Sequence, residues 1–365
     1  MKALVIGGAT IDVITSIEPD DIECISMKNA TNSFLMMEQG KKVEASRIDT
    51  HVGGGATNAA VCMARLGGEV SAVLKIGDDL DGQSILSRLN SEGINTDFVV
   101  KEPDQSTGKS VVVCSHDRNA GIFVNRGANT SLKDQEITQS MFDGIDMVYV
   151  STLSAASAAV FPKIVELAKK SGAFVACNPG IRQIRRRKEK LIEALKWVDL
   201  LAINKEESEA LAEGFLTPSP HFPDCNTGDP VLYREGLGEK SSKVSLPDFT
   251  EKIMGMGCKY VVITNGSEGA YLASDNAILF RPAIPCVVEA TIGAGDAFNA
   301  TIAYALADKK TVWTALSMAA VNASAVAATL DTQSGLMCND ALKSRVLPMD
   351  NSRIPTFQIK ETDAA

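Results

Sequence analysis

The residues best suited to chemistry form a glycine-bearing turn late in the chain. A β-branched run ends at Ile292 and is followed by Gly293, Ala294, Gly295 and Asp296, where a small-residue helical pattern begins. Amides in the first turn of a helix lack helical acceptors and lie at its positive end, so they can hold an anion such as a phosphoryl group. Asp296 can then take a proton from a hydroxyl that attacks phosphorus. The alternative is a tight strand-to-helix turn with Asp296 near the N-cap.

A second glycine segment and an early carboxylate are suited to binding a substrate. Gly53 and Gly54 belong to a run of three glycines that precedes Asn58 at the start of a predicted helix. Glycines let a ligand approach the backbone closely, and the Asn58 amide can both donate to and accept from a hydroxyl. Asp12 ends the opening strand segment and can bind substrate hydroxyls. The alternative for the glycine run is a flexible turn before a helix.

Two more predicted strands end in polar residues. Asn204 and Glu207 follow a strand over 200–203. They can form a capping box, or they can lie near a magnesium ion and its waters, because Mg²⁺ often uses few direct protein ligands. Another strand ends in the small polar segment that contains Thr264, Gly266 and Gly269, which suits contacts to a nucleotide phosphate or ribose.

Composition narrows the class of protein. The chain has 365 residues, is 45% hydrophobic and carries a net charge of −9, so it can bury a large core and does not resemble a nucleic-acid binder. No apolar stretch approaches the ~18 residues of a membrane span. Eight cysteines without a Cys-x-x-Cys pair predict free thiols in the cytoplasm, and three scattered histidines argue against zinc or Ser–His hydrolases.

Alternating apolar runs and helical patterns predict a mostly parallel α/β sheet covered on both faces, with ligands beyond the C-terminal strand ends. The expected strands cover 3–6, 70–76, 147–150, 173–177, 200–203 and 260–264, and the expected helices cover 56–66, 82–90, 156–170, 189–197, 205–213, 293–306 and 311–328.

Three regions interrupt this alternation. Residues 13–51 and 97–127 contain short strand-like pieces that predict a small second sheet standing off the main domain. Within the first, residues 34–37 are either ordinary core or an exposed apolar lid and dimer contact. Residues 217–247 form a long irregular insertion, and 346–365 form a C-terminal tail. The main domain is expected over 1–345, with both strand-like segments inserted in it.

In order and spacing, these segments resemble the PfkB/ribokinase family of carbohydrate and nucleoside kinases. The resemblance covers about residues 2–336, and its motifs are weak singly but specific as an ordered set. The matching segments are 53–58, 64–67 and 77–82, Asn204 with Glu207, Thr264 with Gly266, and 291–296.

The resemblance implies a Rossmann-like three-layer α/β domain with a β-sheet lid, and ATP-dependent phosphorylation of a sugar-like hydroxyl. It implies Asp296 as base and the amides of 293–295 as the anion hole. It also implies Asn204 and Glu207 near Mg²⁺ and phosphate, with Glu207 reaching the metal through water. The implied ligand contacts are Thr264 and Gly266 to the nucleotide, Asn322 to adenine, and Asp12, Gly54 and Asn58 to the substrate.

Two departures from the family pattern affect these expectations. Ala290 stands where family members usually carry an aspartate that helps to hold a monovalent cation, which puts potassium activation in doubt. Residues 148–154 lack the acidic residue that ribokinases place against the sugar, which weakens ribose as the substrate.

The sequence therefore predicts phosphorylation of a hydroxyl, expected to be primary, on a small sugar by a cytoplasmic homodimer joined through its lid. A nucleoside kinase is the first alternative, with residues 34–37 forming an apolar slot for the base. A non-catalytic sensor that binds a sugar or nucleotide is the second.

Overall fold

The computed structural model describes residues 1–17, 23–26, 33–36, 39–40, 42–114, 120–239, 242–347, 349 and 355–359. For the strands at 23–26 and 33–35 it describes the backbone without the side chains, so the expectations for residues 34–37 lie outside what it describes, apart from an exposed Met36.

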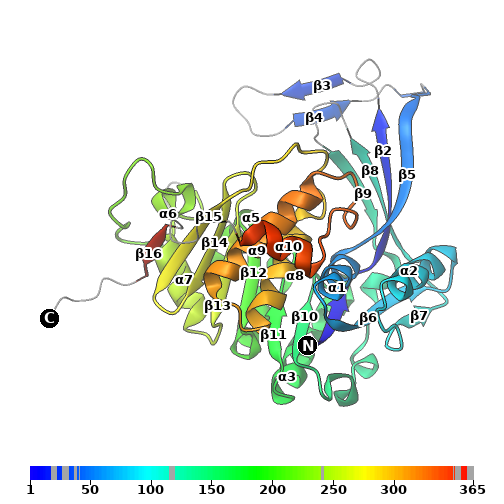
Figure 1. Cartoon of the computed structure of the whole chain (residues 1–365), viewed down its shortest axis with the longest axis horizontal. Helices are drawn as coiled ribbons and strands as arrows, with labels where there is room; N and C mark the ends of the chain where they lie inside the picture. The colour runs from blue at the N-terminus through cyan, green and yellow to red at the C-terminus, as the bar shows by residue number, and fades with distance from the viewer. Residues whose placement is uncertain are drawn as a thin grey trace.

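A ten-stranded sheet runs through the centre of the described chain (Figure 1). Its order is β16-β15-β14-β13-β12-β11-β10-β1-β6-β7, parallel from β13 to β7 and antiparallel from β13 outward to β16. The strands are β1 (Lys2–Gly7), β6 (Glu69–Gly77), β7 (Val100–Glu102), β10 (Met147–Val150), β11 (Phe174–Cys177), β12 (Leu200–Asn204), β13 (Tyr260–Thr264), β14 (Gly269–Ser274), β15 (Ala277–Pro282) and β16 (Thr356–Gln358).

Helices cover both faces of this sheet, which explains why its central strands are continuous apolar runs. In β1, Ala3 and Val5 join one core, and Leu4 and Ile6 join the other. The first core is covered by α1 (Gly55–Arg65), α2 (Leu80–Ser91), α8 (Ala294–Ala307), α9 (Val312–Ala327) and α10 (Asn339–Val346). The second is covered by α3 (Phe161–Lys170), α4 (Ile181–Ala194), α5 (Lys205–Ala212), α6 (Val231–Glu235) and α7 (Leu246–Met254). Short 3-10 helices η2 (Gly127–Thr130), η3 (Asp134–Glu136), η4 (Gln139–Phe142), η5 (Ala155–Val160) and η6 (Leu195–Trp197) lie in the connections.

A smaller sheet stands off the main body, at the upper right in Figure 1. Its strand order is β5-β2-β8-β9, from β2 (Thr10–Ile17), β5 (Ala45–Gly53), β8 (Gly108–Cys114) and β9 (Ala120–Asn125). A hairpin of β3 (Glu23–Ser26) and β4 (Ser33–Met36) lies between β2 and β5 in the chain. We call the four-stranded sheet the lid sheet. The expected α/β domain with a small lid is therefore confirmed.

The structure differs from the sequence expectations at several boundaries. β7 adds to the edge of the main sheet, so the lid part of 97–127 starts at β8. The expected tail contributes β16, which pairs with β15. The insertion at 217–247 contains α6 and an isolated bridge between Leu237 and Val244. The β14–β15 hairpin was not predicted.

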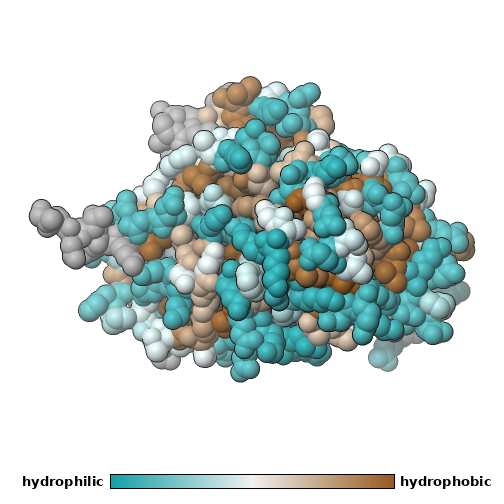
Figure 2. All heavy atoms as spheres, turned by 90° about the horizontal axis from the view of Figure 1, so that it is seen from below, coloured by the Kyte–Doolittle hydropathy of each residue, from teal (hydrophilic) through white to brown (hydrophobic). Residues whose placement is uncertain are grey.

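The described surface is mixed in character. Polar residues cover most of the face seen in Figure 2, with apolar residues in separate patches between them. Among the described helices, none combines the length and hydropathy needed to cross a membrane. The cysteines whose side chains are described are free thiols.

Candidate active site

The glycine-bearing turn forms the start of α8, as the sequence predicted. Gly293 is its N-cap, in a left-handed conformation with φ of 81°, and a Cβ there would lie 2.6 Å from Cβ of Thr332. The amide of Ala297 donates to Gly293 O at 2.9 Å. The amides that precede it in this first turn lack helical acceptors, and the space beside Gly295 is open. This end of α8 therefore has the free donors that an anion needs.

Asp296 projects from this first turn toward the start of α1. Asn58 Nδ2 donates to Asp296 Oδ2 at 2.8 Å, and a Cβ at Gly55 would lie 3.4 Å from Asp296 Oδ1. Burial raises the pKa of Asp296; the hydrogen bond from Asn58 lowers it, and the charge of Asp12 raises it. The carboxylate thus has a raised pKa and stands beside the anion-binding turn, as a general base requires.

The glycine run positions the start of α1 against the end of β1. Gly54 is the N-cap of α1 with φ of 100°, and a Cβ there would lie 2.7 Å from Ala9 Cα. Ala56 N donates to Gly8 O at 3.0 Å. Only glycine fits this close approach, which fixes the start of α1, the helix that carries Asn58, against the segment after β1.

Asp12 lies in β2, on the lid sheet, rather than at the end of the first strand. Its Oδ1 accepts hydrogen bonds from Thr10 Oγ1 at 2.9 Å and Ser110 Oγ at 2.6 Å. Its side chain is buried and lies against Gly53. The structure therefore brings Asp12, Gly53, Asn58 and Asp296 together at the junction of lid and main domain.

Asn204 and Glu207 form the predicted capping box at the start of α5. Glu207 N donates to Asn204 Oδ1 and Asn204 N donates to Glu207 Oε2, both at 2.9 Å. Burial raises the pKa of Glu207 to about 7, and the charges of Glu206 and Asp296 add to this against backbone hydrogen bonds that lower it. The capping role and a role near a cation are compatible, because the capping bonds of Glu207 use Oε2 alone.

A cavity of about 470 Å³ adjoins the start of α8. Thr264, Gly266 and Gly269, which the sequence assigned to the nucleotide, lie in its wall with Ala294 and Gly295. The rest of the wall includes Phe298 of α8, Ala320, Ala323 and Ala327 of α9, Arg281 and Pro282 at the end of β15, and Ile284 just after it. Its volume and mainly apolar lining suit a nucleoside beside the anion-binding turn.

Asn322 does not line this cavity. It is fully buried, donates from Nδ2 to Thr301 Oγ1 at 2.8 Å and accepts at Oδ1 from Met337 N at 2.9 Å. Its neighbours Ala320 and Ala323 reach the cavity because each residue of a helix turns by about 100°. The structure thus places Asn322 on another face of α9, away from the site expected for adenine.

Several residues at the site escaped the sequence analysis. Ser151 follows β10 and lies beside Gly55; its position after a buried strand was an available signal. Asn129 holds Ala9, with Ala9 N donating to Oδ1 at 2.9 Å and Nδ2 donating to Ala9 O at 2.7 Å. Thr332 Oγ1 donates to Asn58 Oδ1 at 2.9 Å, although the two residues are 274 positions apart in the sequence. No local sequence pattern predicts such a contact.

The described residues contain no cluster of three or more His, Cys, Asp or Glu side chains that could hold a metal ion. A single buried carboxylate, Glu207, fits Mg²⁺ bound largely by phosphate oxygens and water. It does not fit a cation held by the protein alone.

Comparison with known proteins identifies the family. The model of the pfkB family of carbohydrate kinases matches residues 20–337. The chain is 26% identical over 304 residues to a bifunctional ribokinase/ribose-5-phosphate isomerase A of Fructilactobacillus sanfranciscensis, covering 83% of this chain and 48%, about half, of that protein. It is 24% identical to ribokinase of Bacillus subtilis, covering 85% of this chain and 93% of that one.

Solved structures share the fold at low identity. Arabidopsis thaliana ribokinase complexed with ribose and ATP matches with a TM-score of 0.72 and 21% identity, over 96% of this chain and 99% of that one. Burkholderia thailandensis nucleoside kinase in complex with inosine matches with a TM-score of 0.71 and 17% identity, over 94% and 97%. The family model, the fold and the ordered motifs agree: the chain belongs to the pfkB family of carbohydrate kinases and is a phosphotransferase of the ribokinase type.

Proposed function

We propose that this enzyme transfers the γ-phosphoryl group of ATP to a hydroxyl, expected to be primary, of a small sugar, with Asp296 as general base. The observation that carries the proposal is the position of Asp296 in the first turn of α8, next to open amides, with Asn58 donating to it at 2.8 Å. A proton acceptor and an anion-binding site at one helix start are what in-line phosphoryl transfer needs.

In the proposed reaction the acceptor hydroxyl attacks the γ-phosphorus and gives its proton to Asp296. The new O–P bond forms as the bond to the bridging oxygen breaks, and ADP leaves. The amides of 293–295 stabilise the charge on the transferring group, and such donors are commonly worth ~3–4 kcal/mol each. Asp12, Gly53, Gly54 and Asn58 position the acceptor, since these residues converge beside Asp296.

The nucleotide is proposed to occupy the cavity beside α8, with its phosphates toward Gly295. Thr264, Gly266 and Gly269 line the same cavity at the ends of β13 and β14. When bound, Mg²⁺ would neutralise phosphate charge, and Glu207 and Asn204 would hold its waters. Burial raises the pKa of Glu207, and a cation bound nearby would favour its ionised form.

Ala290 is buried, and its amide donates to Ala327 O at 3.3 Å. It brings no carboxylate to the position where the family resemblance leads us to expect an aspartate, so we propose that turnover does not require potassium.

The lid sheet is proposed to join two copies of the chain. Its register places Val111 opposite Phe123, and Ile48 shares their face, which is the face opposite to Asp12 and Ser110. Of these three apolar residues, Val111 is 37% exposed, Phe123 is 64% exposed and Ile48 is 67% exposed. An apolar sheet face directed away from the site suits a self-association surface.

A coupled ADP-release assay tests the function across pentoses, hexoses, keto-sugar acids and nucleosides, with and without K⁺. We expect one class of small sugar to give ADP formation that is abolished without Mg²⁺. A nucleoside as the best acceptor would replace the sugar by the first alternative. Tight binding of a sugar or nucleoside without ADP formation from any acceptor would overturn the kinase proposal in favour of a sensor.

A further inference from the structure

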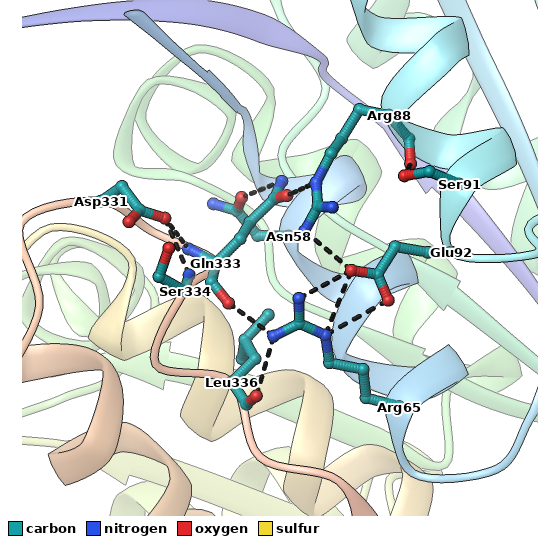
Figure 3. A network of polar contacts seen from close by, with 9 residues as sticks. All are labelled: Asn58, Arg65, Arg88, Ser91, Glu92, Asp331, Gln333, Ser334 and Leu336. Carbon is teal, nitrogen blue, oxygen red and sulfur yellow. Dashed lines mark hydrogen bonds and ion pairs between the residues drawn. The ribbon is translucent and has the colours of Figure 1, made fainter. Parts of the chain in front are cut away.

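Asn58 links the proposed base to the loop that follows α9, and Figure 3 shows the part of this network that runs from Asn58 through Gln333 to Arg88 and Arg65. Its Nδ2 donates to Asp296 Oδ2 at 2.8 Å, and its Oδ1 accepts from Thr332 Oγ1 at 2.9 Å and Gln333 Nε2 at 3.1 Å. The side chain is 2% exposed, so water cannot replace these partners. A flipped amide would place Oδ1 against the carboxylate, and the two donors on Oδ1 oppose that flip.

Gln333 has its own orientation set from α2. Its Oε1 accepts from Arg88 Nε at 3.0 Å, and Arg88 Nη2 pairs with Glu92 Oε1 at 2.7 Å. An arginine can only donate, so Arg88 fixes Oε1 toward itself and leaves Nε2 to face Asn58. Every hydrogen bond in this series is therefore donated in the same direction. The series begins at Arg88, which can only donate, and ends at the Asp296 carboxylate, which can only accept.

The backbone of this loop is also held on both sides. Arg65 Nη1 donates to Gln333 O and to Leu336 O, both at 2.8 Å. Asp331 Oδ1 accepts from the amides of Gln333 and Ser334, both at 2.8 Å. Gln333 is 3% exposed, so neither its backbone nor its side chain has freedom to turn away from Asn58.

We propose that Gln333 is a positioning residue for phosphoryl transfer: by donating to Asn58, it keeps the Asn58 amide in the orientation that donates to Asp296, and Arg88 sets the direction of the chain. This proposal rests on the proposed role of Asp296 as base. Gln333 acts through Asn58 and does not itself touch the reacting atoms.

The consequence is a control on the ionisation of the base. Burial raises the pKa of Asp296, whereas the hydrogen bond from Asn58 lowers it. Since a general base must be deprotonated, losing this donation would move the loss of activity on acidification to higher pH. Among the described residues, the titratable groups whose pKa shifts are linked to Asp296 are Asp12 from β2, Cys62 from α1, Tyr149 from β10 and Glu207 from α5, and none of these four is a cation.

The strongest variant is Gln333→Glu, which is nearly the same size and keeps an acceptor for Arg88, but whose new carboxylate also raises the pKa of Asp296 through its charge, an effect that the uncharged Gln333→Met lacks. The Gln333→Glu change replaces the donor to Asn58 Oδ1 by a second oxygen and so favours the flipped amide. Gln333→Met removes the donor but leaves Thr332 to hold the orientation. Ser334→Ala is the matched control, because this neighbour in the same loop contacts Asp331 and not Asn58.

The measurement is the pH profile of kcat/KM for the acceptor, with thermal unfolding as a check of folding. We expect Gln333→Glu to move the acid limb of this profile to higher pH by about one unit, which lowers kcat/KM ~10-fold at pH values below the limb. Gln333→Met should move it less and Ser334→Ala not at all, with the KM for nucleotide unchanged throughout. Titration of the Asp296 ¹³Cγ resonance, assigned by its loss in Asp296→Asn, should show the same upward shift in Gln333→Glu without turnover.

An active wild type whose acid limb and Asp296 resonance are unmoved in Gln333→Glu would overturn the positioning role alone. Equal losses of activity and thermal stability in the Glu and Met variants, with no shift of the acid limb, would also overturn the positioning role. They would show that the loop contributes to stability alone. Failure of the wild type to form ADP with any acceptor would instead overturn the proposed function, and the resonance would still report on the hydrogen-bonded chain.

Discussion

The Asp12 carboxylate lies against Gly53, with Oδ2 occupying the place where a Cβ at residue 53 would stand. Its other oxygen is held by Thr10 and Ser110, so the carboxylate cannot withdraw without losing two hydrogen bonds. Within the lid sheet, β2 and the end of β5 thus meet at a contact with no spare room, just before α1 begins.

Gly53→Ala should therefore displace Asp12 and impair acceptor binding. We expect kcat/KM for the acceptor to fall by about 10- to 100-fold, as misplaced positioning groups commonly cause, while nucleotide affinity stays the same. Steady-state kinetics in both substrates measure this. Gly121→Ala is the control, because a Cβ there meets nothing within 4 Å on the same lid sheet. Equal losses in the two variants would show that the lid tolerates no added methyl, irrespective of Asp12.

Asp296→Asn should remove the base and keep the shape of the site. We expect kcat to fall at least ~100-fold with little change in nucleotide affinity, because proton transfer is lost and the amides of 293–295 remain. Single-turnover kinetics and nucleotide titration separate the two effects. Turnover near the wild-type rate on the true acceptor would remove Asp296 from the role of base.

Glu207 should make stability depend on pH when no metal is bound. Burial raises its pKa to about 7, so the folded state favours the protonated form. The stability it contributes is present below its ordinary pKa of about 4.3 and is lost as pH rises toward 7. Glu207→Gln stays neutral and keeps the capping box. We expect its Tm to exceed that of the wild type above neutral pH and the difference to disappear in acid.

The control for this measurement is Glu193→Gln, since the Glu193 side chain is exposed, pairs with Lys190 at 2.9 Å and is not among the charges that raise the pKa of Glu207. A Tm difference between Glu207→Gln and wild type that stays constant from acid to alkaline pH would contradict the assignment. The glutamine variant should also need more Mg²⁺ for half-maximal turnover.

Arg281 should contribute to nucleotide affinity. It lines the cavity proposed for the nucleotide, burial lowers the pKa of its guanidinium, and its Nε has no hydrogen-bond partner among the described residues. Its Nη2 contacts Met349 Sδ at 3.1 Å, a weak acceptor. We expect Arg281→Leu to weaken nucleotide binding about tenfold, or ~1.4 kcal/mol, with kcat little changed. Calorimetric titration with ATP checks this, and unchanged affinity would refute it; the exposed Arg345→Leu is the control.

Phe123→Asp should separate the proposed dimer, because it places a charge on the apolar outer face of the lid sheet. Sedimentation of the wild type at micromolar concentration should give a dimer, and the variant a monomer. Leu347→Asp, at a residue that is 82% exposed outside the lid, should leave the dimer intact. A monomeric wild type would contradict the proposed interface.

The sequence was informative where the backbone itself makes the site. Gly54 and Gly293 adopt positive φ and approach Ala9 and Thr332 too closely for a side chain. Because only glycine tolerates both conditions, the residue type itself predicted these close turns. The parallel strands were equally visible, since burial on both faces makes them continuous apolar runs such as β10.

Other parts depend on contacts between distant segments and have no local signature. Gln333 reaches Asn58 across 275 residues, and Asn322 could not be assigned to a face of α9 without knowing which face meets α8. The β14–β15 hairpin was not predicted because the segment 277–282 shows no regular alternation of apolar and polar residues and ends in Arg281 and Pro282.

The short joint between β1 and β2 also constrains how the enzyme can change. Gly8 and Ala9 are the residues that connect the two sheets there, and Asn129 binds both polar groups of the Ala9 backbone. Rotation at this joint would break both bonds, so any swing of the lid has to be absorbed by twisting of β2 and β5 further out. Engineering a new acceptor preference near Asp12 would consequently alter the mechanics of closure as well, because recognition and hinge share the same few residues.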